Sequence, residues 1–206
     1  MSCKRLLICL LVCLIPAGCG SLGPKPDPSR FFALASLPRT GERAPDAAGT
    51  NPLALGIGPI KFPGYLDRQE IVTRVSQNRF AVAENDRWAE ALEENFSRVL
   101  SQNLSILLQT DRIVAFPWER NQRPTFQVQV EVLRFDPNAE HIAELWARWI
   151  VLDDAKKSLV VKESYLSQQA RDKSTEGSVA AMSEVVSGLS KEIAAAIRGI
   201  GGKKGP

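Results

Sequence analysis

The stretch TFQVQVEV, residues Thr125–Val132, has the clearest strand pattern in this chain. Apolar and polar side chains alternate in it, so a strand would place Phe and Val on one face and Gln and Glu on the other. The apolar positions change parity at Leu133 and Phe135, which indicates a bulge or a bend. We therefore expect a strand that buries one face and changes direction near its end.

Further strand patterns lie on both sides of this stretch. Downstream, Ala143–Leu152 alternates, a turn follows at residues 153–157, and Ser158–Ser167 returns as its partner. Short connections of this kind favour antiparallel pairing. Upstream, the sequence predicts strands at Phe31–Leu37, Leu53–Ile60, Ile71–Val75, Arg79–Ala83 and Ile113–Phe116, with a hairpin turn at residues 76–78.

A first long helix is predicted from about Arg87 to Gln109. Its apolar residues recur at steps of three and four, which gives one buried stripe that we interpret as core. Asn85 or Asp86 can cap this helix by accepting hydrogen bonds from free backbone N–H groups.

A second long helix is predicted near the C-terminus, opened by Asp172, Ser174 or Thr175 and ended by the glycines at positions 199, 201 and 202. Strands, a helix, longer strands and a final helix together indicate one α+β domain. We expect a largely antiparallel or mixed sheet with two long amphipathic helices packed on one face.

The N-terminus has the pattern of a lipoprotein signal. Lys4 and Arg5 form a basic start, and residues 6–15 (LLICLLVCLI) are apolar but too short to span a bilayer. Ala17 and Gly18 then precede Cys19, which resembles the lipobox of bacterial lipoproteins, although Pro16 departs from the usual Leu or Val. The resemblance implies diacylglycerol on Cys19 and cleavage before it. The alternative is an ordinary signal peptide whose Cys is incidental.

These patterns divide the chain into four parts. We expect a signal peptide at residues 1–18, the lipidated Cys and a flexible Gly- and Pro-rich tether at 19–29, the α+β domain at 30–199, and a disordered tail at 200–206. After cleavage Cys19 is the sole cysteine, which leaves no disulfide and no free thiol nucleophile. Without Lys4 and Arg5, 24 basic and 23 acidic side chains remain, a net charge of +1. Nothing in this balance indicates a nucleic-acid partner.

No catalytic, cofactor or metal site is predicted. The single histidine, His141, lies in a loop without a nucleophile motif, and one His without free Cys does not make a zinc site. The run Gly56–Pro59 lacks the third glycine and the Lys of a phosphate-binding loop. The acidic pairs 93–94 and 153–154 fall on a polar helix face and in a turn. We conclude that the chain is not an enzyme.

One segment is unusual in composition. Residues 58–74, GPIKFPGYLDRQEIVTR, place two prolines, two glycines and two aromatic residues beside Asp67 and Arg68. One interpretation is a rigid turn in which Asp67 and Arg68 pair locally. The other is a preorganised contact surface, because Tyr and Arg are favoured at protein interfaces.

This segment resembles the signature of the PqiC/YmbA family of ABC-type transport auxiliary lipoproteins, most specifically in Pro63, Gly64, Tyr65, Leu66, Asp67 and Arg68. The resemblance extends over about residues 29–189. Weaker matches are Phe31–Leu34, Arg87–Leu92, Phe116–Trp118, Val132–Asp136 and Ala147–Trp149.

The resemblance implies a periplasm-facing lipoprotein, usually on the outer membrane, that works with a mammalian-cell-entry (MCE) domain protein and its transporter complex. Such systems move lipid between two membranes. It implies Cys19 as the lipid site and Pro63–Arg68 as a motif for folding or partner contact, without catalytic residues. Gly20, the residue after the lipidated Cys, favours the outer membrane under the sorting rule of enteric bacteria. A homo-oligomer is possible. The alternatives are a stand-alone lipid-binding carrier and an envelope-stabilising lipoprotein.

Overall fold

The computed structural model describes residues 26–39, 53–119 and 122–201. Cys19, the expected signal peptide and most of the tether lie outside these residues, so those expectations stay predictions. The final helix continues to Gly201, so residues 200 and 201 belong to the folded domain and not to the tail where we expected them.

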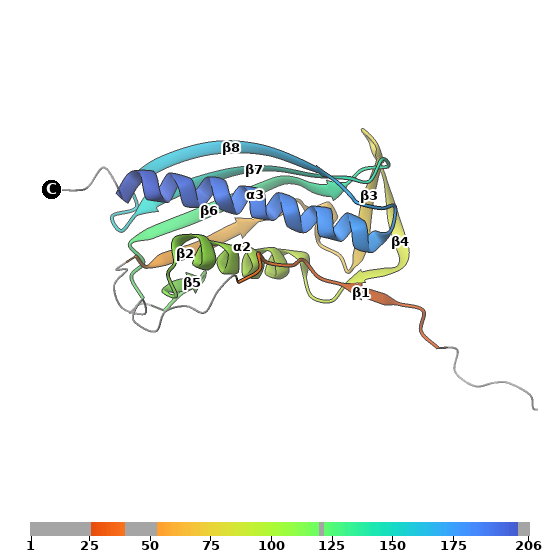
Figure 1. Ribbon diagram of the computed structural model, residues 1–206, viewed down its shortest axis with the longest axis horizontal. Helices are drawn as coiled ribbons and strands as arrows, with labels where there is room; N and C mark the ends of the chain where they lie inside the picture. The colour runs from red at the N-terminus through yellow and green to blue at the C-terminus, as the bar shows by residue number, and fades with distance from the viewer. Residues whose placement is uncertain (1–25, 40–52, 120–121, 202–206) are drawn as a thin grey trace, which may run out of the picture.

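A five-stranded mixed sheet forms the body of the domain, in the order β5-β2-β6-β7-β8 (Figure 1). β2 runs parallel to β5 and β6, whereas β6, β7 and β8 are antiparallel. The predicted α+β fold with a mixed sheet is therefore confirmed. The strands are β2 Leu55–Lys61, β5 Ile113–Ala115, β6 Phe126–Pro137, β7 Ile142–Asp153 and β8 Ser158–Gln169.

The change in apolar parity within β6 does correspond to a bulge. The pairing of β6 with β7 shifts register between Val132 and Arg134. Val132 on one side of the shift and Phe135 on the other are both buried. The extra residue lets a strand of twelve residues keep its apolar side chains toward the core along its whole length.

Both helices cover one face of this sheet, as predicted. They are α2, Leu92–Leu108, and α3, Thr175–Gly201. α3 lies along β7 and β8 while α2 lies over β2 and β5, and the two helices pack against each other (Figure 1). In the described part of the chain, neither helix is long and apolar enough to cross a membrane.

The predicted start of the first helix was wrong by about five residues. Strand β4, Arg79–Trp88, includes Asn85, Asp86 and Arg87, which we had expected as helix caps or first turn. Asp86 is buried and accepts hydrogen bonds from Arg30 and from the hydroxyl of Thr175 at the start of α3. These tertiary bonds keep the residue in the strand, although its type favours helix caps.

β4 belongs to a second, three-stranded sheet in the order β1-β4-β3. β3, Glu70–Ser76, and β4 form the predicted hairpin, and β1, Arg30–Phe32, pairs parallel to β4. β1 is shorter than expected because the following backbone bonds to α2 instead. The N–H groups of Leu34 and Leu37 donate to the side-chain oxygens of Asn95 and Asn103, each at 2.7 Å.

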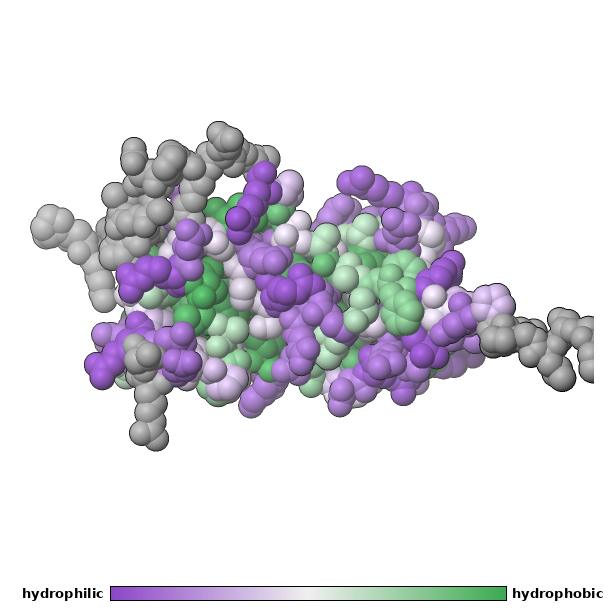
Figure 2. Space-filling model, turned by 90° about the horizontal axis from the view of Figure 1, so that it is seen from below, coloured by the Kyte–Doolittle hydropathy of each residue, from purple (hydrophilic) through white to green (hydrophobic). Residues whose placement is uncertain are grey.

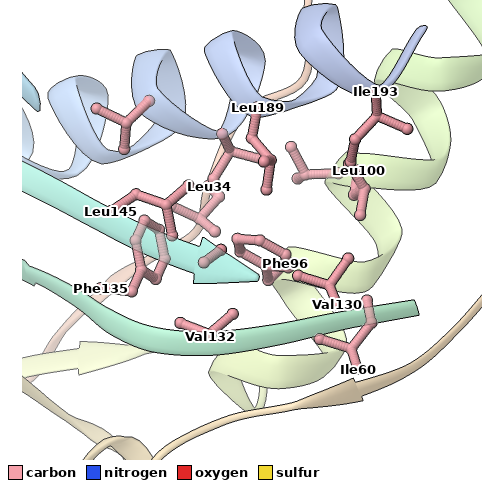
Figure 3. Close-up of a cluster of buried hydrophobic side chains, with 14 of the residues drawn as sticks. Leu34, Ile60, Phe96, Leu100, Val130, Val132, Phe135, Leu145, Leu189 and Ile193 are labelled. Atoms are coloured by element: carbon pink, nitrogen blue, oxygen red, sulfur yellow. The ribbon is translucent and has the colours of Figure 1, made fainter. Parts of the chain in front are cut away.

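Side chains from both helices and the sheet meet in one core. Phe62, Phe96 and Phe135 pack edge to face, with ring centroids 5.2 to 6.3 Å apart. Burial of these large side chains is the main stabilising contribution to the fold. Figure 3 shows Phe96, Leu100, Phe135, Leu145, Leu189 and Ile193 pointing toward one another from α2, α3 and the sheet.

Candidate docking surface

The motif Pro63–Arg68 forms a tight turn between β2 and β3. Gly64–Leu66 is one turn of 3₁₀-helix, in which the N–H of Leu66 donates to the carbonyl of Pro63 and that of Asp67 to Gly64, at 3.0 and 3.2 Å. Leu66 is buried in the core, while Gly64, Asp67 and Arg68 are exposed. The motif thus has an inner part and an outer part.

Tyr65 belongs to the inner part. Its hydroxyl donates to Oδ2 of Asp136 at 2.6 Å, and its ring stacks on Phe80 of β4 at 4.6 Å between centroids. Burial, followed by the hydrogen bond to Asp136, raises the pKa of the Tyr65 hydroxyl well above its ordinary value. The side chain is therefore a neutral hydrogen-bond donor over the physiological range.

Asp136 gathers partners from three elements. It is fully buried and accepts hydrogen bonds from Arg74 at 3.0 and 3.1 Å and from Arg134 at 3.2 Å. A buried carboxylate needs such partners, because an uncompensated buried charge is strongly destabilising. The guanidinium of Arg74 also lies 4.3 Å from the ring centroid of Phe80. Through Asp136, Tyr65 fastens the 3₁₀ turn and the β3-β4 hairpin to the end of β6.

The outer part does not form the local pair that we considered. Among the described residues no ion pair joins Asp67 to Arg68. The turn is rigid because of its backbone bonds and Tyr65. Asp67 and Arg68 instead project beside a hollow of about 570 Å³. The two residues are thus available for contact with another molecule.

This acidic hollow, as we call it, lies between the 3₁₀ turn and the start of α2. Its floor includes buried Leu66 and Trp88, and the exposed carboxylates of Glu93 and Glu94 stand on its rim with Asp67. Two segments that resemble the family, residues 63–68 and 87–92, therefore meet at one place on the surface. Eighteen residues lie between them in the sequence, which did not indicate that they are neighbours.

A larger candidate surface lies on the opposite side of the main sheet. Among the described residues, the face of β6, β7 and β8 that points away from the helices is covered only at the Asp136 end of β6, by the 3₁₀ turn and the β3-β4 hairpin. We call it the open face. Its cross-strand rows are Arg134–Trp146–Tyr165, Glu131–Arg148–Glu163 and Gln129–Ile150–Val161.

The open face combines aromatic and charged side chains. Tyr165 and Val161 are 61% and 69% exposed, and Trp146 is 39% exposed. Trp146 and Arg148 donate to the carboxylate of Glu163 at 2.7 and 2.8 Å, and the bond from Arg148 is the main reason that the pKa of Glu163 is lowered. These bonds hold Trp146 and Arg148 in fixed positions on a rigid pair of strands.

Sequence reasoning did not single out the open face. The alternation predicted in Ala143–Leu152 puts Ala143, Leu145, Ala147, Trp149 and Val151 on one side of β7, and all five are buried. The sequence feature that could have indicated the open face is Trp146, a large apolar residue that alternates with the buried residues of β7 and so points to the other side of the sheet. An exposed large apolar group in a patch is more informative than a buried one.

A third segment that resembles the family, residues 116–118, packs against the glycines of β2. Phe116 and Trp118 pack across β2, where side chains larger than glycine would not fit. A Cβ at Gly56 would lie 2.9 Å from the ring of Trp118, and one at Gly58 would lie 2.8 Å from Cβ of Phe116. Gly58 also has a φ of +113°, which glycine adopts far more readily than other residues. The glycines that superficially suggest a phosphate loop are therefore explained by packing.

His141 has the closest approach to a catalytic arrangement in the described residues. Its Nδ1 lies 3.3 Å from the hydroxyl of Ser178. Ser178 is only 6% exposed and donates to the carbonyl of Ser174 at 3.1 Å, as a serine in a first helical turn often does. Such a hydroxyl is not positioned to attack a substrate. Among the described residues, no group of three or more His, Cys, Asp or Glu could hold a metal ion.

The fold defines a class: a single α+β domain with a mixed sheet and two long helices on one face. The chain matches the model of a family described as the ABC-type transport auxiliary lipoprotein component over residues 35–194. The chain therefore belongs to that family, as its sequence motifs predicted. Its members are transport auxiliary components and lipoproteins, which indicates a lipid-anchored protein of the cell envelope that associates with a transporter complex.

Solved structures share the fold. An uncharacterised protein superposes with a TM-score of 0.67 at 16% identity, covering 82% of this chain and 98% of the other. A DUF330 protein from Xanthomonas campestris gives a TM-score of 0.65 at 12% identity, covering 85% of this chain and 100% of the other. No curated protein matches the sequence. At these identities the likeness concerns the fold alone.

Proposed function

We propose that this protein is the docking component of an MCE-type, ABC-linked system that moves lipid between two membranes. On this proposal, residues 1–18 are a signal peptide, Cys19 carries the lipid, and the domain faces the periplasm from the outer membrane. Membership of the transport auxiliary family supports the general role. The MCE-domain partner, the lipid cargo and the choice of membrane are the parts to be tested.

The observation that carries the docking role is the open face. Tyr, Trp and Arg dominate the binding energy of protein interfaces, and all three occur there in adjacent cross-strand rows. Strands of twelve residues, pinned by α3 on the other side, hold them without large losses of backbone freedom on binding. The acidic hollow, with Asp67 and Arg68 of the motif, offers a second and smaller contact.

The test is crosslinking in intact cells followed by recovery of the lipoprotein. We expect the wild type to recover an MCE-domain protein and the double variant Trp146→Ala, Tyr165→Ala to lose most of it. Val82→Ala is the matched control, because Val82 is also an exposed apolar residue (46%) but lies in β4. Recovery of no MCE-domain protein with the wild type would refute the proposed partner. Equal recovery with both variants would refute the open face as its site.

The role of the motif is tested separately with Arg68→Ala and Asp67→Ala. Both side chains are exposed and neither joins the Tyr65 network, so the domain should melt as the wild type does. Loss of partner recovery without a change in melting would support a contact role for the outer part of the motif. Full recovery would assign the whole motif to folding.

The lipid-carrier alternative is less well supported by the packing. The centre of the space between the helices and the sheet is filled by the Phe62, Phe96 and Phe135 cluster and its neighbours. A hollow of about 800 Å³ lies between α2 and the edge formed by β2 and β5, but its lining includes the charged residues Glu93, Glu94 and Arg98, which do not suit an acyl chain. Native mass spectrometry of the purified domain distinguishes the two functions. Persistent co-purifying lipid would favour the carrier.

A further inference from the structure

The side of the domain nearest the tether exposes an aromatic residue. Phe31, in β1, is 62% exposed, whereas the strand positions on the other face, Asp86 and Trp88 of β4, are 5% exposed. Phe31 therefore points away from the domain. An isolated exposed apolar residue is ordinary, so its surroundings decide whether it has a role.

A cation lies directly beside Phe31. Arg87 is its cross-strand partner in β4, and Glu70 of β3 is the next residue in the same row. Arg87 is partly exposed, no ion pair joins it to Glu70 among the described residues, and its charge acts on the carboxylate of Asp27. Its Nε is buried, so a molecule outside the domain would have to be bound by the two terminal amino groups. Phosphate oxygens match its geometry well.

Small residues surround this row. Ala33 and Ala89 follow Phe31 and Arg87 at the same parity and are both exposed, and the N–H of Ala89 donates to the carbonyl of Phe32 at 2.9 Å. Figure 2 shows a face of the molecule on which hydrophobic (green) surface lies between hydrophilic (purple) residues. We call Phe31, Ala33, Glu70, Arg87 and Ala89 the tether-side patch.

The length of the preceding chain fixes what this patch can reach. Phe31 lies twelve positions after Cys19, and this length of chain spans at most about 40 Å when fully extended. If Cys19 is inserted in a bilayer, Phe31 is the first large exposed apolar side chain after the anchor among the described residues. A surface held this close meets the bilayer at high effective concentration.

We propose that the tether-side patch rests on the phospholipid surface to which Cys19 anchors the chain. Phe31 enters the boundary between headgroups and acyl chains, and Arg87 binds a lipid phosphate. The carboxylates of Asp27 and Glu70 both lie near Arg87, so the contact does not rest on attraction of the patch as a whole to anionic lipid. This inference rests on the lipid anchor of the proposed function. It adds a defined orientation of the domain at the membrane.

The test uses the mature lipidated protein in vesicles of phosphatidylethanolamine and phosphatidylglycerol. Acylated Cys19 cannot be labelled, so Phe31→Cys provides a single site for an environment-sensitive fluorophore. Val161→Cys, on the open face, is the matched control. We expect the label at position 31 to shift its emission to the blue and to be quenched by lipid-attached quenchers, and the label at 161 to do neither. Arg87→Gln should weaken the quenching at position 31.

The possible failures are distinguishable by flotation. If the protein floats with the vesicles but the label at 31 behaves as in water, the orientation is refuted and the anchor stands. If the label at 161 is quenched as strongly as that at 31, the patch is not specific and the inference is also refuted. If the protein does not float, the lipid anchor itself is refuted, and the inference falls with it.

Discussion

Replacing Tyr65 with Phe removes one hydroxyl and leaves the ring that stacks on Phe80. The lost bond is 2.6 Å long and ends on a carboxylate that is fully buried. Hydrogen bonds to charged groups contribute roughly 1.5–3 kcal/mol. Because Asp136 keeps its bonds from Arg74 and Arg134, we expect the lower part of this range, about 1.5–2 kcal/mol, from the variant.

The assay is urea and thermal unfolding of the domain at neutral pH. For a domain of this size, the expected loss corresponds to a melting temperature lower by roughly 3–8 °C. Tyr165→Phe is the matched control: it makes the same chemical change on a side chain that is 61% exposed, and should shift stability by less than about 0.5 kcal/mol. Equal melting of Tyr65→Phe and the wild type would refute the view that Tyr65 fastens the turn to β6.

Three further predictions concern Tyr65, Gly58 and Cys19. The raised pKa of folded Tyr65 means that its contribution is intact below about pH 10, the unfolded value, and is lost as pH rises above it. The urea midpoint of the wild type should therefore fall more between about pH 9 and 11 than that of Tyr65→Phe, which has no hydroxyl to titrate at this position. Gly58→Ala should cost about 2 kcal/mol or more in urea unfolding, from positive φ and contact with Phe116, whereas Gly64→Ala, with no neighbour within 4 Å of the new Cβ, should be tolerated. Cys19→Ala should move the protein from the membrane to the soluble fraction without changing its melting; retention in the membrane fraction would contradict the lipid anchor.

Much of the fold was readable from local pattern. The β3-β4 hairpin and the β6 bulge were predicted because alternation of apolar and polar residues fixes which face is buried. The two helices were found because their apolar stripes are long. Errors arose where tertiary bonds override local preference: Asp86 binds Arg30 and Thr175 in place of capping a helix, and Leu34 donates to Asn95 in place of extending β1.

The candidate site was less predictable for the same reason. Tyr65 was identified within a motif, but its partner Asp136 is 71 residues away, and no local pattern joins the two. Residues 63–68 lie beside the start of α2 because the β3-β4 hairpin between them brings the two segments together. The alternation of apolar and polar residues in these strands does not specify that arrangement. The open face could have been predicted from Trp146, which lies on the opposite side of β7 from the buried residues. Its exposure depends on which face α2 and α3 cover, and this is decided by packing.

The way the N-terminal segment is fastened determines how the domain responds to force. On the proposed function, the lipid on Cys19 moves with its bilayer, so a partner that holds the domain would place the tether under tension. That tension enters at Arg30, whose guanidinium binds Asp86 at 2.6 and 2.9 Å, and continues into backbone that bonds Asn95 and Asn103 of α2. Because β1 runs parallel to β4, a pull along the strand strains several of these bonds at once. Tension would thus be shared between the small sheet and a helix of the core, so the segment would not peel away one bond at a time.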